Sequence, residues 1–137
     1  MEVNYSLVAA AVVAQFVLGA FWYSPLMFGK WWMEIMECTD CSPEKMKKMQ
    51  KEMTPFYFVQ LLLTLLLTVS LANLAPYMGG FSIYHVAFWV WIGFIVPTQV
   101  ACVIWANTKR KYWLKQIFVM VGNQLASLML ASWILSL

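Results

Sequence analysis

The sequence predicts an all-α membrane protein in which four transmembrane helices form one antiparallel bundle, with a short interfacial helix and a short polar helix between the first and second spans. The chain has 137 residues, of which 63% are hydrophobic and 11% are charged, and its mean hydropathy is +0.71. Soluble domains are about half apolar and about a quarter charged. Four long apolar segments are separated by Ser-Pro, Pro-Tyr-Met-Gly-Gly and basic sequences. We therefore expect a single membrane domain over residues 1–137 and no separate soluble domain.

Each apolar segment reaches the length of about 20 residues that a helical span needs. Leucine runs at 61–63 and 65–67 mark the second segment as the clearest membrane helix. In the third segment Pro97 follows Gly93 by four residues, so we expect a kink, because proline removes one helical hydrogen bond. The expected spans are residues 4–23, 55–75, 82–106 and 112–135.

The connection over residues 25–54 begins where the first span ends. Ser24 followed by Pro25 is typical of a helix start, because serine caps the first turn and proline loses no hydrogen bond there. Residues 25–37 are too short and too amphipathic to cross the bilayer, so we expect an interfacial helix. Amphipathic rings and lysines settle at the level of the lipid headgroups. The residues expected there are Trp22, Tyr23, Lys30, Trp31 and Trp32.

A polar, lysine-rich segment fills the rest of this connection. Ser42 and Pro43 predict the start of a short helix. Thr54 and Pro55 predict its end and the beginning of the second span as a separate helix. We interpret the lysines as a solvated face that also meets anionic lipid headgroups.

All lysines and arginines, nine in total, lie within residues 30–51 and 109–115, in the first and third connections. Under the positive-inside rule both connections face the cytoplasm and both chain termini lie outside. We therefore expect a multi-pass protein of the inner or plasma membrane. The net charge of +3 is small and serves orientation. The expected partners are membrane lipids and further copies of the chain, forming a homodimer or a larger oligomer, and not nucleic acid.

Three stretches together resemble a known family. They are residues 18–33, with Trp-Tyr-Ser-Pro-Leu at 22–26 and Phe-Gly-Lys at 28–30, residues 88–98, and the Gly-Asn pair at 122–123. On these motifs the chain resembles DUF1761, a family of small bacterial and fungal membrane proteins of unknown function. The resemblance covers nearly the whole chain and implies four spans. It implies no activity and no catalytic residues, and it does not include the cysteine pair or the lysine-rich segment.

Cys38 and Cys41 have the spacing of a redox pair or of half a metal site. A structural zinc site needs four ligands, and one pair supplies two, so a second subunit would have to complete it. The alternative is two ordinary loop thiols. In a reducing cytoplasm we expect them to be free, and we expect no metal or other cofactor.

His85 is the only histidine and the only side chain within a span that titrates near neutral pH. It either makes a structural hydrogen bond near the Gly79-Gly80 turn or takes part in proton or ligand binding. The other polar side chains within spans either join helices or form a small polar site at depth. The residues considered for such a site are Gln15, Gln60, Thr64, His85, Gln99 and Asn123.

Three function classes follow from these residues. The preferred one is a small, oligomeric, non-enzymatic channel or carrier for a small solute or an ion. The alternative is a protein of the inner membrane that binds lipids or acts as a scaffold. An enzyme is the least favoured, because the chain has no phosphate-binding loop, no catalytic triad and no paired carboxylates within a span.

Overall fold

The computed structural model describes residues 2–38, 40–106 and 109–137, and over these ranges the chain forms helices and no strands. The helices are α1 (Tyr5–Trp22), α2 (Gly29–Ile35), α3 (Pro43–Leu74), η1 (Ala75–Tyr77), α4 (Ile83–Val90), η2 (Trp91–Ile95), α5 (Val96–Trp105), η3 (Arg110–Tyr112) and α6 (Trp113–Leu135). Four stretches are long and apolar enough to cross a membrane: α1, α3 with η1, the run α4–η2–α5, and η3 with α6. This confirms four segments able to span.

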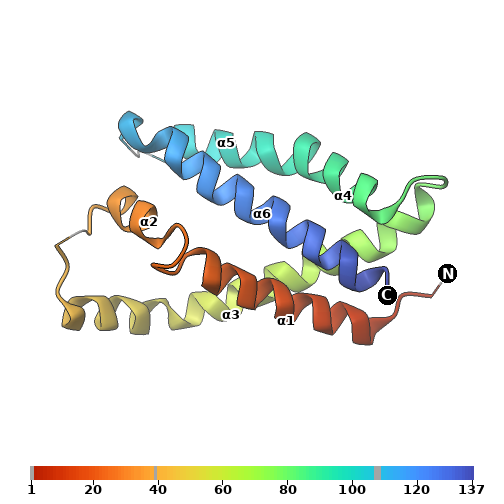
Figure 1. The fold of residues 1–137 in the computed structure, drawn as a ribbon, viewed down its shortest axis with the longest axis horizontal. Helices are drawn as coiled ribbons and strands as arrows, with labels where there is room; N and C mark the ends of the chain where they lie inside the picture. Colours follow the sequence, from red (N-terminus) through yellow and green to blue (C-terminus); the bar gives the residue numbers. More distant parts are fainter. Residues whose placement is uncertain (1, 39, 107–108) are drawn as a thin grey trace.

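Successive spans run in opposite directions, with α6 between α1 and the α4–η2–α5 run, and α3 crossing α1 (Figure 1). Both chain ends and the turn between α3 and α4 lie at one end of the molecule, which we call the terminal end. The loop with α2, the start of α3 and η3 lie at the opposite end, which we call the basic end (Figure 1). The two predicted basic connections are therefore on the same side of the molecule.

Small side chains bring α1 and α6 into close contact. Asn4 caps α1 by accepting hydrogen bonds from two backbone N–H groups of the first turn. On the buried face of α1, Val8 and Ala11 are covered by the rest of the chain, and Ala11 packs with Ala131 and Ile134 of α6. Alanine allows two helix backbones to approach closely. In lipid, where the hydrophobic effect does not drive helix association, such close packing is what holds helices together.

The polar helix and the second span are one helix, which corrects the break predicted at Pro55. Ser42 caps α3 as expected, with Pro43 in the first turn. Pro55 lies inside α3 and costs one backbone hydrogen bond, while the Thr54 hydroxyl donates to the Gln50 carbonyl just before it. At 1.5 Å per residue, the 32 residues of α3 extend about 48 Å. This exceeds the hydrocarbon thickness of a bilayer, about 30 Å, so α3 is longer than a membrane span requires.

The third span contains a π-helical segment, η2, where a proline kink was predicted. The backbone N–H of Val96 donates to the carbonyl of Trp91, a wider turn than that of an α-helix. Pro97 follows directly in the first turn of α5, where its missing N–H costs little. The irregularity expected at Gly93 and Pro97 is therefore accommodated by one wide turn between two α-helices.

Candidate functional site

The polar contact best defined within the spans joins α1 to α3. Gln15 is 4% exposed, and its Nε2 donates to Thr68 Oγ1 at 2.7 Å and to the Ala11 carbonyl at 3.1 Å. Thr68 is 1% exposed, and its own hydroxyl donates to the Thr64 carbonyl at 2.7 Å. The Gln15 amide and the Thr68 hydroxyl thus satisfy each other at the helix crossing. We had not included Thr68 in the site, although it continues the four-residue spacing of Gln60 and Thr64.

Gln60 and Thr64 extend this contact toward the basic end along the surface of α3. The Thr64 hydroxyl donates to the Gln60 carbonyl at 2.8 Å, and Gln60 Nε2 lies 3.4 Å from Thr64 Oγ1. Gln60 is exposed, Thr64 is half-buried and Thr68 is buried. We call Gln60, Thr64, Thr68 and Gln15 the polar track. Its α3 part runs from residue 60 to residue 68, about 12 Å along the helix axis.

The remaining members of the predicted site lie on other helices. Gln99 is half-buried on α5. The Oδ1 of Asn123 on α6 is buried with no hydrogen-bond partner in the described part of the chain, and so is the Oε1 of Gln116 seven residues earlier. His85 is exposed at the start of α4, with its ring 5.6 Å from that of Phe81. Among the described residues, no hydrogen bond joins Gln99, His85 or Asn123 to Gln15, Gln60 or Thr64, so a single site of all six stays a prediction.

Two tryptophans donate hydrogen bonds to the backbone of α6 on either side of residue 120. Trp22 Nε1 donates to the Val119 carbonyl at 3.0 Å, and Trp91 Nε1 donates to the Val121 carbonyl at 2.9 Å. A side chain at Gly122 would meet the Trp22 ring at 3.1 Å, so glycine leaves the room that this ring needs. The half-buried Trp22 ring thus joins α1 to α6, and its level relative to the lipid headgroups stays a prediction.

Helix α2 is held against the first turns of α6 at the basic end. Phe28 and Trp31 pack on Phe118, with ring centroids 5.6 and 6.1 Å apart. Lys115 donates to Glu34 at 3.0 Å and lies 5.6 Å above the Trp31 ring. Trp32 packs on Tyr23, the residue after α1, and Lys30 is exposed. The contacts of α2 account for its place in this chain, and its relation to a membrane surface stays a prediction.

A second ion pair joins the end of α2 to η3. Glu37 follows α2 with a φ of +55°, a left-handed conformation, and its carboxylate accepts a hydrogen bond from Lys109. This hydrogen bond and the charge of Lys109 lower the pKa of Glu37 and raise the pKa of Lys109. The left-handed residue reverses the chain, so that the N–H of Cys38 donates back to the Met33 carbonyl at 2.9 Å.

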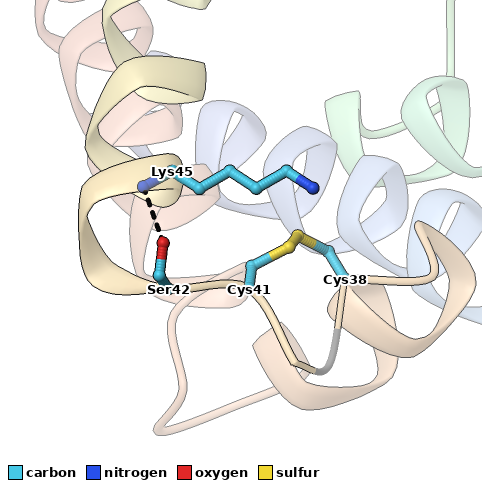
Figure 2. The surroundings of a disulfide bond; sticks show 4 residues. All are labelled: Cys38, Cys41, Ser42 and Lys45. Carbon is cyan, nitrogen blue, oxygen red and sulfur yellow. Dashed lines mark hydrogen bonds between the residues drawn. A yellow bond between two sulfur atoms is a disulfide. The ribbon is translucent and has the colours of Figure 1, made fainter.

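Cys38 and Cys41 form a disulfide in the structure (Figure 2). Our expectation of free thiols was wrong, because the turn after Glu37 brings the two Cα atoms to 5.1 Å, within the range that a disulfide bridges. Bonded sulfurs offer no thiolate to a metal ion. Among the described residues, no three His, Cys, Asp or Glu side chains gather as a possible metal site.

The two ends of the molecule differ in charge. All nine lysines and arginines lie at the basic end, where Lys109 and Lys115 pair with acidic side chains of the α2 region. At the terminal end, a hollow of about 480 Å³ lies among the N-terminal residues, the turn after η1 and the end of α6. Glu2, Asn4 and Ser136 are its polar lining residues. No local pattern predicts this hollow, because residues from three distant segments form it.

The sequence matches the DUF1761 family, described as a protein of unknown function, over residues 6–136. This match confirms the resemblance seen in the motifs. No curated protein and no solved structure matches the chain.

Proposed function

We propose that this chain, which belongs to the DUF1761 family of unknown function, is a non-enzymatic membrane protein whose copies associate and pass a small polar solute or an ion between them. The observation that carries the proposal is the exposed amide of Gln60 within an apolar span. Gln60 begins a polar track that ends at the buried contact between Gln15 and Thr68. A polar path that is open at one side of a single chain suits a pathway completed by a neighbour.

The environment of Gln60 argues for a protein neighbour. Its nearest polar partner is Thr64 on the same helix, at 3.4 Å. A side-chain amide facing hydrocarbon keeps unsatisfied hydrogen-bonding groups, whereas a contact with another helix recovers about 0.6–2 kcal/mol. Within the most apolar 18 residues of α3, 11% are buried, so a large surface is open to such a helix. A symmetric pair of copies would place two polar tracks side by side.

The buried end of the track supports a path between copies rather than through one chain. Gln15 and Thr68 are each almost fully buried and bonded to one another at 2.7 Å. Opening this contact inside a single bundle would leave both groups unsatisfied, which is costly in a low-dielectric interior. A solute that moves along the exposed side of α3 leaves this contact intact.

The test measures flux of small cations and of small neutral solutes into liposomes that contain the purified protein. Gln60→Leu keeps the side-chain size and removes the amide, so flux should fall severalfold while the oligomer mass stays the same. Ser70→Ala is the matched control. Ser70 is also exposed on α3, but its hydroxyl bonds the Leu66 carbonyl of its own helix, and it lies about 80° away around the axis. Flux that is absent, or that Gln60→Leu leaves unchanged, would overturn the proposal.

A lipid-binding or scaffolding role is the second candidate, and the charge of the basic end favours it. Five of the nine basic residues lie in the first connection, four of them as exposed lysines in the first turns of α3: Lys45, Lys47, Lys48 and Lys51. Each lysine near an anionic surface contributes about 1 kcal/mol to binding. Native mass spectrometry of the protein from mixed lipids tests this role. Retained anionic lipid that is lost when all four lysines become glutamine, with no flux in liposomes, would support it over transport.

A further inference from the structure

We propose that Cys38 and Cys41 are an exchangeable redox pair, in which Cys41 is the sulfur that forms the mixed disulfide with a protein dithiol or with glutathione. This inference is independent of transport and of lipid binding. It concerns the turn between α2 and α3, at the end of the molecule that carries the charged residues (Figure 2).

The two sulfurs differ in access and in surroundings. Cys38 is 6% exposed, whereas Cys41 is half-buried and reaches the surface. Cys41 directly precedes Ser42, the residue that caps α3, so it lies at the positive end of a 32-residue helix. Figure 2 shows the Lys45 side chain extending from the first turn of α3 along the same side as the two sulfurs. Positive charge near Cys41 favours the thiolate that an exchange reaction uses.

The position of the disulfide argues against a role in stabilising the fold. It closes a ring of only four residues, and loop closure contributes least for the shortest loops. Both sides of the turn are already fixed without it. The packing of Phe28 and Trp31 on Phe118 holds the α2 side, and the hydrogen bond from the Lys45 N–H to Ser42 Oγ holds the α3 side. Reduction therefore leaves the spans in place.

The charge distribution points in the same direction. The positive-inside rule predicts that the basic end faces the cytoplasm. Disulfides in that compartment are usually transient and serve catalysis or redox sensing. A stable structural bond conflicts with the predicted cytoplasmic position, whereas a reversible pair is compatible both with that prediction and with the disulfide in the structure.

Reduction of the pair by an external dithiol proceeds by thiol–disulfide exchange in two steps. A thiolate of the external dithiol attacks Cys41 Sγ, the bond between Cys41 and Cys38 breaks, and its electron pair stays on Cys38 Sγ, which takes a proton. The second thiolate of the reductant then attacks the reductant's own sulfur in the mixed disulfide and releases Cys41 as a thiolate, which takes the second proton. The chain gains two electrons and two protons, and the external dithiol becomes a disulfide. Oxidation runs through the same steps in reverse.

The test uses the full chain in nanodiscs with Cys102→Ser, which removes the remaining cysteine, free in the structure. Thiols are counted by alkylation and mass spectrometry before and after treatment with reduced thioredoxin as the protein dithiol. We expect no thiols before and two after, at unchanged helix content, and reoxidation by oxidised glutathione. A bond that yields only after the protein is unfolded, or thiols that never pair, would overturn the proposal.

Two single variants in the same background test which sulfur reacts. With Cys38→Ser, Cys41 remains and should take up glutathione from its disulfide at least about tenfold faster than Cys38 does with Cys41→Ser. Equal rates, or a faster Cys38, would contradict the assignment of Cys41. The thiol count in the chain with both cysteines does not depend on these variants, so the exchange itself stays testable if either variant fails to fold.

Discussion

Helices α3 and α6 are both long and apolar enough to cross a membrane, yet the rest of the chain covers them very differently. Among the most apolar 18 residues of each stretch, 39% are buried in α6 and 11% in α3. Helix α6 contacts α1, α2, α4 and α5, whereas α3 packs chiefly on α1. The chain therefore folds around α6, and α3 presents most of its surface to lipid or to another protein.

The residue types at the contacts explain this difference better than hydropathy does. Along α6, Gly122 and Ala131 are small where α1 crosses, and two tryptophan N–H groups bond its carbonyls. Along α3, leucines dominate, and many of them are exposed, including Leu62, Leu63 and Leu66. Since lipid chains are as apolar as leucine, a leucine surface gains little by packing on another helix, whereas small residues gain close contact.

The largest expected effect is the loss of the α1–α6 contact in Ala131→Leu. Ala131 is completely buried against Ala11, and the larger side chain has no space between the two backbones. Overpacking of this kind costs about 1–3 kcal/mol, and we expect the upper part of that range. Thermal unfolding in detergent, followed by circular dichroism, measures it. Leu66→Ala on the exposed side of α3 is the control and should change stability by less than about 0.5 kcal/mol. Equal losses in both variants would contradict the central role of α6.

A smaller effect is expected where α3 does contact the bundle. Gln15→Leu and Thr68→Val each remove the hydrogen bond between these side chains. A double-mutant cycle should give a coupling of about 0.6–1.7 kcal/mol, the range for such bonds between membrane helices. The same cycle for Gln15 and exposed Ser70, which share no contact, should give a value near zero. A coupling near zero for Gln15 and Thr68 as well would mean that this bond does not hold α3 to α1.

Sequence reasoning succeeded where one local property decides the outcome. Hydropathy located four spans, and Ser42 caps α3 because serine followed by proline favours a helix start. It failed at Pro55, where the cost of one lost hydrogen bond did not end a helix that continues on both sides. A propensity rule gives the free-energy cost of one residue in a helix. Whether the helix continues through that residue depends on the stability of the whole helix.

The candidate site was only partly predictable, because its contacts join distant residues. The stripe of Gln60, Thr64 and Thr68 is visible in the sequence, but its partner Gln15 lies 53 residues from Thr68. Trp22 resembles an interfacial anchor by type, and only its bond to Val119, 97 residues away, shows a packing role. The cysteine pair depends on the left-handed conformation of Glu37, which is uncommon for a residue other than glycine.

Substitutions on the outer surface of α3 should leave folding unchanged and report only on contacts between copies of the chain. Two single cysteines are introduced into a chain whose own cysteines are replaced by serine. Leu63→Cys lies one turn from Gln60 on α3, and Leu65→Cys lies about 160° around the helix axis from position 63. Both positions are exposed in the single chain. If copies meet along the Gln60 side, a short bifunctional maleimide in native membranes should link copies at position 63 several times more efficiently than at 65. Equal or absent linking would count against association through this side.

The smallest expected effect concerns the ion pair of Glu37 and Lys109 at the basic end. The hydrogen bond and charge of Lys109 lower the pKa of Glu37 below its ordinary 4.5, with a weaker contribution from the charge of Lys111. A carboxyl whose pKa is lowered by folding stabilises the folded state at any pH above its ordinary pKa. This contribution is lost as the pH falls through the lowered pKa. The pKa of Lys109 is raised above its ordinary 10.5 by the same partner, so its contribution is lost only as pH rises through that raised value. The pair therefore persists across neutral pH.

Titration of the Glu37 carboxyl by carbon-13 NMR tests this pair directly. In Lys109→Gln the midpoint should rise toward the ordinary carboxyl value, because the hydrogen bond and the nearest charge are removed. In Lys111→Gln, the matched control, the midpoint should rise much less, because that lysine contributes only a weaker charge effect. Both side chains of the pair are more than half exposed, so solvent screening keeps the effect on stability small. Equal shifts in the two variants would mean that the summed charge of the basic end, and not a specific pair with Lys109, lowers the pKa of Glu37. Helix α2 would then be held chiefly by the packing of Trp31 and Phe28 on Phe118.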